Sequence, residues 1–335
     1  MAPASPSPES DPPADDSSVT IDGTVVGPGE RRQMELPVAN LPTQTPLHLP
    51  VEVICGRRPG PRLWLSAAIH GDELNGMEII HRVLQRLDAR NLRGQVIAVP
   101  IVNVFGFIQQ DRYLPDRRDL NRCFPGSPRG SLASRLAHLL MTEIVGQCTH
   151  GIDLHTASHH RINLPQVRGN LDDPATLQMA EAFGAPIMIH GDAPGGSLRA
   201  AVARQQIPVI TYEAGEPHRF NREAVDLGVK GVLRVMSDLK MRGRKRPRAR
   251  QSMQTRRRTW VRAPRSGILR LAVKLGTSVT RKQPLGHIHD AFGGGAAPVT
   301  SPADGMVIGH TLTPLVNQGD GIIHIAKDIQ TTTPG

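Results

Sequence analysis

The amino-acid sequence predicts an α/β domain followed by a small all-β domain. Its 335 residues are enough for about two domains. Between about residues 45 and 241, apolar strand-like runs alternate with helical patterns, which is typical of an α/β sheet. From Arg262 to Ala326 the chain holds only short strand-like runs separated by Gly and Pro turns, so this part is expected to be all-β.

The elements of the α/β part can be assigned in order. The continuous apolar run at Arg62–Ile69 predicts a buried strand, and the helical spacing of Met77, Ile80 and Leu84 predicts a helix. Ser131 is expected to cap a further helix, because a serine hydroxyl can accept a hydrogen bond from the first turn. The predicted strands are Arg62–Ile69, Gln95–Val102, Gly151–His155, Pro186–Ile189 and Ile207–Tyr212. The predicted helices are Asn75–Leu87, one that begins after Ser131, and Arg222–Met241, with further helices expected between the later strands.

The C-terminal part repeats itself. Ala263-Pro-Arg-Ser-Gly267 recurs 38 residues later as Ser301-Pro-Ala-Asp-Gly305. Each copy leads to a glycine turn, at Gly276 or Gly319, and then to an alternating strand. Two related hairpin units folded on one another would form a small β sandwich.

Charge defines two further segments. The net charge of +10 is local, because residues 240–262 hold eleven Lys and Arg and no acidic residue. We expect residues 242–258 to be a solvated basic linker, with nucleic-acid binding there as a less favoured hypothesis, since Trp260 is the only aromatic residue nearby. Residues 1–30 are acidic and rich in Pro, Ser and Ala, which predicts a disordered tail. The predicted units are therefore residues 1–30, 31–241, 242–258 and 259–330.

Cysteine content and hydropathy suggest the compartment. The three cysteines show no paired spacing, so neither a disulfide framework nor a cysteine-based zinc site is expected. No stretch reaches the ~18 apolar residues of a spanning helix, and the first residues do not resemble a secretory signal. We expect a cytoplasmic protein without a membrane partner. The oligomeric state is left open.

Polar residues at three predicted strand ends indicate a metal site. His70 and Glu73 follow the first strand three residues apart, so their side chains can converge on one cation, and Gly71 relieves crowding between them. His155, at the end of another strand, is the natural third ligand, with His159 and His160 as competitors. Two imidazoles and a carboxylate leave the fourth position of a tetrahedral zinc ion open, as hydrolytic sites require.

Other residues near these strand ends suggest the remaining machinery. Glu213 ends a strand and is the candidate general base, with Glu216 as an alternative. Asp153 lies on the same side of its strand as His155 and either orients a ligand or is purely structural. The loop Gln110–Gly126 holds four arginines, which suit a carboxylate substrate and an oxyanion.

Four ordered motifs resemble the succinylglutamate desuccinylase and aspartoacylase family, which is related to the zinc carboxypeptidases. They are His70-Gly-Asp-Glu73, Asp119-Leu-Asn-Arg122 followed by Phe124-Pro-Gly126, Asp153-Leu-His155-Thr156 and Glu213-Ala-Gly-Glu216. The resemblance covers about residues 45–327. It implies a mixed sheet flanked by helices, one zinc ion bound by His70, Glu73 and His155, and Glu213 as the general base.

The resemblance also implies substrate contacts. Asn121 and Arg122 would hold the substrate carboxylate, and Arg199 is a further substrate-binding candidate. An upstream arginine would polarise the scissile carbonyl; Arg112 is favoured over Arg117 and Arg118.

The C-terminal part is similar to the biotinyl-lipoyl type of β sandwich but lacks the Met-Lys-Met hairpin that accepts a cofactor. The expected function is zinc-dependent hydrolysis of the amide bond of a small, acidic N-acyl amino acid. The alternatives are a zinc carboxypeptidase acting on a peptide or cell-wall fragment, and a non-catalytic module that binds a polyanion through residues 242–258.

Overall fold

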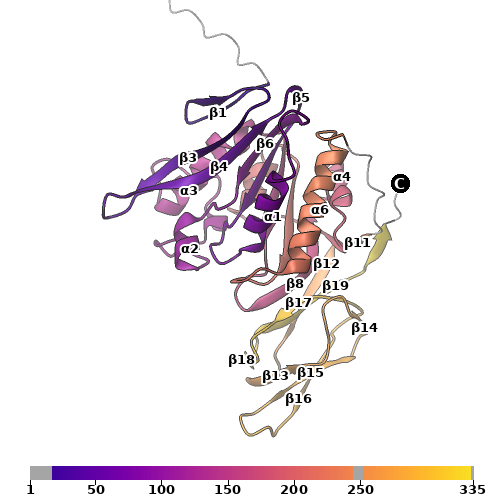
Figure 1. Cartoon of the computed structure of the whole chain (residues 1–335). Coiled ribbons are helices and arrows are strands. Elements are labelled where there is room, and N and C mark those ends of the chain that lie inside the picture. Colours follow the sequence, from indigo (N-terminus) through magenta and orange to yellow (C-terminus); the bar gives the residue numbers. More distant parts are fainter. Residues whose placement is uncertain (1–16, 244–251, 333–335) are drawn as a thin grey trace, which may run out of the picture.

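A computed structural model describes residues 17–243 and 252–332 of the chain. The α/β part forms the broad end of the molecule, and the C-terminal strands form a narrower extension (Figure 1). In the described part of the chain, no helix is long and apolar enough to cross a membrane.

One large mixed sheet organises the α/β part. Strands β6, β5, β7 and β10 run parallel to one another, and β4 and β8 flank them in the antiparallel sense. The carboxyl ends of the parallel strands therefore lie along one edge of the sheet. In spatial order the strands are β3 (Arg31–Asn40), β4 (Pro46–Cys55), β6 (Arg93–Val99), β5 (Arg58–Ala67), β7 (His150–His155), β10 (Val209–Gly215) and β8 (Arg161–Gly169).

Helices cover both faces of this sheet. Because side chains alternate along a strand, Leu63 and Leu65 of β5 face one helix layer while Trp64 faces the other. The first layer contains α1 (Asn75–Leu84), α4 (Pro174–Phe183) and α6 (Arg222–Asp238). The second contains α2 (Val104–Gln109), α3 (Leu132–Glu143), α5 (Leu198–Ala203) and the short 3-10 helices Leu120–Arg122 and Val145–Gln147. The predicted α/β fold, a mixed sheet flanked by helices, is confirmed.

Local chemistry explains where the helices begin and end. The hydroxyl of Ser131 accepts a hydrogen bond from the backbone N–H of Ser134, so the predicted cap is present. Helix α1 ends at Leu84, three residues earlier than predicted, and α6 ends at Asp238. Strand β8 was not predicted, because Pro165 lies in its middle and a proline argues against a central strand.

The C-terminal strands form two layers around one apolar cluster. The first layer continues the main sheet through the pairing of β8 with β17, and it contains β17 (Gly305–Thr311), β19 (Gly321–Lys327), β12 (Arg257–Arg262) and β14 (Ser278–Val279). The second is a separate sheet of β16 (Ala297–Thr300), β15 (Pro284–His289), β13 (Gly267–Leu271) and β18 (Leu315–Val316). Both layers contribute to the cluster, for example through Leu285 and Ile323.

The sequence repeat corresponds to two equivalent three-strand units. Each unit is a long strand, a two-residue strand and a second long strand: β13, β14 and β15 in the first, β17, β18 and β19 in the second. The long strands pair within each unit, whereas β14 pairs with β17 and β18 with β13. Each short strand thus pairs with a long strand of the other unit, and this pairing holds the two units together.

Two predicted segment boundaries are wrong. Residues 17–30, expected to be disordered, include the hairpin of β1 (Val19–Ile21) and β2 (Thr24–Val26), because Val19, Ile21 and Val26 bury their side chains in the core. Residues 252–258, assigned to the basic linker, include the start of β12 and all of β11 (Ser252–Thr255). Strand β11 pairs with β9 (Ile187–His190) and β20 (Gln330–Thr332). Residues 1–16 and 244–251 lie outside the described residues.

Candidate active site

The candidate active site lies at the carboxyl ends of β5, β7 and β10. His70 and Glu73 follow β5, His155 ends β7, and Glu213 lies near the end of β10. Glu213 is the register partner of His155 on the neighbouring strand. The sheet thus brings together residues that are up to 143 positions apart in the sequence.

His70, Glu73 and His155 form a buried cluster of potential metal ligands. One donor atom from each lies within 4.8 Å of the others, the only such group of three among the described residues. Nδ1 of His70 is 2.7 Å from Oε1 of Glu73, and Nδ1 of His155 is 2.9 Å from Oε2. Two imidazole nitrogens and a carboxylate that face one another are a donor set that fits zinc and leaves a coordination position for substrate or water. The alternatives His159 and His160 are exposed in the following loop.

Carboxylates orient both histidines of the cluster. Nε2 of His155 lies 2.7 Å from Oδ2 of Asp153, and Nε2 of His70 lies 3.2 Å from Oδ1 of Asp119. Metal-binding histidines commonly bond a carboxylate through their second nitrogen, which fixes the ring and directs the first nitrogen to the metal. The geometry therefore favours a role for Asp153 in orienting His155 over a purely structural role.

The charges of the cluster stabilise one another. Burial disfavours the imidazolium form of His155, but Asp153 and Glu73 outweigh it and raise the pKa of His155 well above its usual range. Burial also disfavours the carboxylate of Glu73, but His70 and His155 lower the pKa of Glu73 well below its usual range. Glu73 is therefore ionised, which is the form that binds a metal ion.

Close backbone packing holds the His70–Glu73 turn in place. A Cβ atom on Gly71 would lie only 1.9 Å from the carbonyl carbon of Gly106 in α2, so no larger residue fits there. At the start of α1, Gly76 lies against Ala67 of β5 and Leu154 of β7. Glycine thus lets the turn and the helix approach the sheet closely enough to place Glu73 beside His155.

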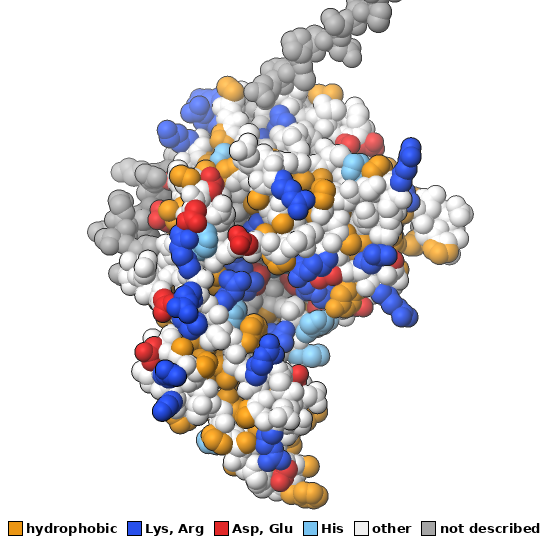
Figure 2. Space-filling model, turned by 180° about the vertical axis from the view of Figure 1, so that it is seen from behind, with side chains coloured by type: hydrophobic (Ala, Val, Ile, Leu, Met, Phe, Trp, Pro, Cys, Tyr) orange, Lys and Arg blue, Asp and Glu red, His pale blue; other side chains and the backbone are white. Residues whose placement is uncertain are grey.

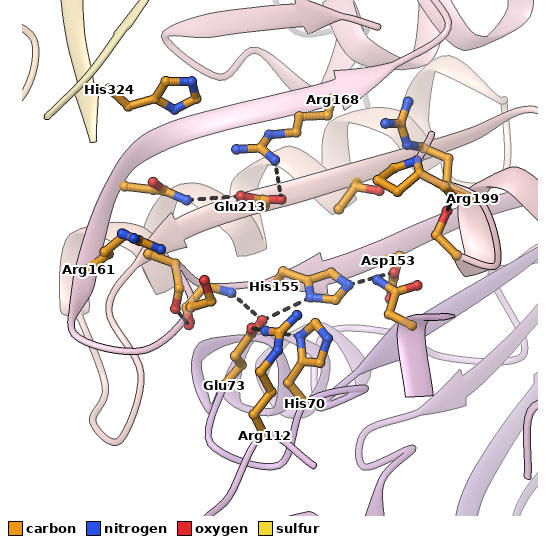
Figure 3. A pocket seen from close by; sticks show the side chains of 18 of the residues that line it. His70, Glu73, Arg112, Asp153, His155, Arg161, Arg168, Arg199, Glu213 and His324 are labelled. Atoms are coloured by element: carbon orange, nitrogen blue, oxygen red, sulfur yellow. Dashed lines mark hydrogen bonds and ion pairs between the residues drawn. The ribbon is translucent and has the colours of Figure 1, made fainter. Parts of the chain in front are cut away.

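Glu213 faces the pocket and is held by two donors. Arg168 forms an ion pair with its Oε1 at 2.9 Å, and the amide of Asn163 donates to its Oε2 at 2.9 Å. Arg168 lies on the far side of Glu213 from His70, Glu73 and His155 (Figure 3). The alternative base, Glu216, instead bonds Arg219 and Asn221 and does not line the pocket.

The arginine-rich loop contributes one guanidinium directly to the cluster. Arg112 pairs with Glu73 at 3.3 Å and with Asp119 at 2.9 Å. Arg117 and Arg118, the alternatives, have exposed side chains outside the pocket. Of these three candidates, Arg112 is therefore the one that contacts the cluster, through Glu73.

Asn121 and Arg122 also line the pocket. Oδ1 of Asn121 accepts a hydrogen bond from the backbone N–H of Leu198 at 2.9 Å, which leaves its amide nitrogen for a ligand. Arg199 lines the pocket from α5 and donates to the carbonyl of Gly191 at 2.8 Å. All the site residues expected from the sequence thus border one cavity of about 330 Å³.

The cavity has a second group of lining residues that the sequence did not indicate. They come from β8 and from the C-terminal strands β12 and β19, and they are Arg161, Asn163, Arg168, Arg258, Trp260 and His324. They carry no motif, and β8 itself was not predicted, so only the pairing of β8 with β17 reveals that they reach the site. Arg258 was assigned from the sequence to the solvated basic linker, but it is a residue of this pocket.

Comparisons with known proteins agree with this architecture. The model of the succinylglutamate desuccinylase/aspartoacylase catalytic domain matches residues 59–239. An N-alpha-acetyl-L-2,4-diaminobutyric acid deacetylase of Halomonas elongata is 29% identical over 298 residues, which cover 84% of this chain and 86% of the relative.

Solved structures show the same fold. A succinylglutamate desuccinylase/aspartoacylase of Rhodobacter sphaeroides superposes with a TM-score of 0.81 at 28% identity, covering 90% of this chain and 96% of that one. The product-bound ectoine utilization protein EutE (DoeB) of Ruegeria pomeroyi has a TM-score of 0.80 at 21% identity, covering 89% and 94%, and supports the fold alone. Since the family model spans more than half of its residues, this chain belongs to the succinylglutamate desuccinylase/aspartoacylase family.

Proposed function

We propose that the protein is a zinc-dependent deacylase that hydrolyses the amide bond of a small N-acyl amino acid. The observation that carries the proposal is the placement of His70, Glu73 and His155 in one cavity with the carboxylate of Glu213. Family membership and the Halomonas relative, which is named for deacetylating an N-acetyl amino acid, support the reaction class.

His70, Glu73 and His155 would hold one zinc ion per chain. Bound there, the ion would polarise the scissile carbonyl and make a water molecule easier to deprotonate. Glu73 and the histidines are already directed at one another by Asp153, Asp119 and the backbone N–H of Thr156. Little rearrangement of the protein is needed to bind the ion.

Glu213 would act as general base and then as general acid. Its carboxylate removes a proton from the attacking water as the carbon–oxygen bond forms, and returns the proton to the nitrogen as the carbon–nitrogen bond breaks. The products are a carboxylic acid and a free amino acid. Arg168 and Asn163 hold the carboxylate at this position.

The remaining cations would bind the charged parts of the substrate. Arg112 donates to the carbonyl oxygen, where negative charge develops in the transition state. Asn121 and Arg122 bind the carboxylate of the amino acid, and Arg199 lies further along the cavity. A cavity of about 330 Å³ is at the small end of ligand sites, which favours an N-acyl amino acid over a peptide or a cell-wall fragment.

The proposal is tested by measuring amine release from a panel of N-acetyl and N-succinyl amino acids and, for comparison, dipeptides. We expect turnover of N-acyl amino acids, with dipeptides much poorer. Glu213→Gln should retain zinc and lose about 10²- to 10⁴-fold in kcat. Glu216→Gln is the matched control, since Glu216 does not line the cavity. Full activity of Glu213→Gln, or preference for dipeptides, would overturn the proposal.

A further inference from the structure

Strand β10 becomes irregular immediately after Glu213. Up to that residue it keeps a regular parallel register with β7, and Glu213 is the last residue of this register. On the other side of β10, a β-bulge interrupts the pairing with β8 between Glu213 and Gly215. Ala214 therefore has no register partner on either neighbouring strand of the described sheet. Bulges often redirect a side chain next to an active site.

The side chain of Asn75 supplies the partner that the sheet does not provide. Ala214 is fully buried, and its carbonyl accepts a hydrogen bond from the amide nitrogen of Asn75 at 3.0 Å. Oδ1 of Asn75 accepts a second hydrogen bond, from the backbone N–H of Asn221 at 2.9 Å. Asn221 is the N-cap residue of α6. The buried amide of Asn75 thus connects the residue that follows Glu213 to the start of the next helix.

Glycine at position 215 makes room for this contact. Gly215 has a φ of +75°, a left-handed conformation that favours glycine, and a Cβ atom there would lie 2.7 Å from Nδ2 of Asn75. The carbonyl of Gly215 accepts a hydrogen bond from the backbone N–H of Ala157, two residues after His155, at 3.2 Å. The bulge therefore fits closely between Asn75 and the end of β7.

The place of Asn75 in the chain connects the bulge to the His70–Glu73 turn. Asn75 is the first residue of α1 and lies two residues after Glu73. The next residue, Gly76, packs this end of the helix against β5 and β7. The same short segment therefore presents the carboxylate of Glu73 to His155 and holds the backbone beside Glu213.

We propose that Asn75 is a positioning residue, which fixes the carboxylate of Glu213 relative to the proposed zinc ligands. The inference rests on the proposed function, in which Glu213 removes a proton from the attacking water. A general base must lie within about 2.6–3.2 Å of the group that it deprotonates, and a misplacement of about 1 Å can cost about 10²-fold in rate. Asn75 does not line the cavity, so it acts through Glu213 and not on the substrate.

The first test measures kcat, KM and zinc content for two variants of Asn75, with the N-acyl amino acid that the wild type hydrolyses best. Asn75→Ala removes both hydrogen bonds. Asn75→Asp keeps the acceptor for Asn221 and removes the donor to Ala214, and a carboxylate is favourable in the first turn of a helix, so this variant should fold.

Both variants should lower kcat about 10²-fold, while KM changes less than about threefold and the zinc content stays that of the wild type. A loss confined to kcat is expected because the substrate contacts and the metal ligands are unaltered. Unchanged kcat in Asn75→Asp, or a loss of kcat that follows a loss of zinc, would overturn the proposal.

Asp173→Ala is the stability control. Asp173 caps α4 by accepting a hydrogen bond from the backbone N–H of Thr176 at 2.8 Å, and it does not line the cavity. Loss of this cap should lower the melting temperature, as loss of the hydrogen bonds of Asn75 should, but it should leave kcat unchanged. A fall in kcat equal to that of the Asn75 variants would show that kcat follows stability, which would contradict a positioning role.

A double-mutant cycle tests whether Asn75 acts through Glu213. In Glu213→Gln no base is left to position, so Asn75→Asp should lower the residual kcat less than about threefold in that background. An equal loss of about 10²-fold in both backgrounds would overturn the proposal and leave the deacylase assignment intact.

Crystal structures of the wild type and Asn75→Asp test the geometry without turnover. In the variant, the bulge and the carboxylate of Glu213 should shift, while His70, Glu73 and His155 keep their places. This result would support the positioning role even if no N-acyl amino acid is hydrolysed, an outcome that rejects the proposed function alone. An unmoved carboxylate of Glu213 would reject the role of Asn75 and leave the proposed function untouched.

Discussion

Asp153 connects His155, a potential metal ligand, to the core of the sheet. Its Oδ2 lies 2.7 Å from Nε2 of His155, and its Oδ1 accepts a hydrogen bond from the hydroxyl of Ser66 at 2.8 Å. The hydroxyl of Ser66 in turn accepts a hydrogen bond from the buried indole of Trp64. The orientation of the proposed metal ligand is thus fixed by residues of the neighbouring strand β5.

Asp153→Asn should weaken zinc binding about 10- to 100-fold, because an amide orients the imidazole less firmly than a carboxylate does. Ser66→Ala, which removes only the outer hydrogen bond, should have a smaller effect. Both are measured by competition with a chelator at fixed pH. If Asp153→Asn binds zinc as tightly as the wild type, Asp153 does not position His155.

Arg112→Lys should lower kcat by about 100-fold with little change in zinc content. Lysine keeps the charge but not the fork with which Arg112 contacts Glu73 and Asp119 and could reach a developing oxyanion. Arg118→Lys is the control, since that side chain is exposed and pairs with Asp116. Equal losses in the two variants would contradict a special role for Arg112.

Gly71→Ala should lower the melting temperature and the zinc content together. The added methyl group would overlap the backbone of Gly106, and overpacking of this kind costs about 1–3 kcal/mol or more. Gly195→Ala is a suitable control, because nothing lies within 4 Å of a Cβ atom there. Thermal unfolding of the two variants checks this, and an unaltered melting temperature for Gly71→Ala would contradict the close packing.

Because the pKa of His324 is lowered in the native protein, the free energy of unfolding should fall as the pH falls below about 6.5. Burial, together with the positive charges of Arg168, Arg258 and Arg161, lowers the pKa of His324 to about 3. Between these two pKa values the unfolded chain binds a proton that the native protein does not, so the free energy of unfolding falls with falling pH.

At pH 5 the loss amounts to about 2 kcal/mol relative to neutral pH. His324→Phe keeps an aromatic ring against Trp260 and removes the titration, so it should lose less stability over this range. Urea unfolding of both proteins at pH 7 and pH 5 measures the difference. Identical pH dependence would show that the pKa of His324 is not lowered in the native protein.

The sequence predicted the parts of the fold that depend on local patterns. The strand before His70 and the helix capped by Ser131 follow from hydrophobic periodicity and capping, and both are present. Strand β8 was missed because Pro165 obscured it, although pairing with β10, β9 and β17 stabilises it in the structure. Residues 17–30 were misjudged because three buried side chains outweigh their polar composition.

The residues of the candidate site likewise fall into a group that the sequence could indicate and a group that it could not. His70, Glu73, His155 and Glu213 directly follow or end parallel strands, where the topology of an α/β sheet places ligands, so the sequence could indicate them. Their assigned roles remain proposals. The residues from β8, β12 and β19 were not foreseeable, since they reach the cavity only through antiparallel pairing between distant segments.

The most direct test of this account is the zinc content of protein purified without added metal, measured by elemental analysis for the wild type, His155→Ala and His160→Ala. His160 serves as the control, because its side chain is exposed in the loop beyond β7. We predict about one zinc ion per chain in the wild type and in His160→Ala, and almost none in His155→Ala. Wild-type protein that contains no zinc, and takes up none on reconstitution, would contradict the proposed zinc-dependent mechanism.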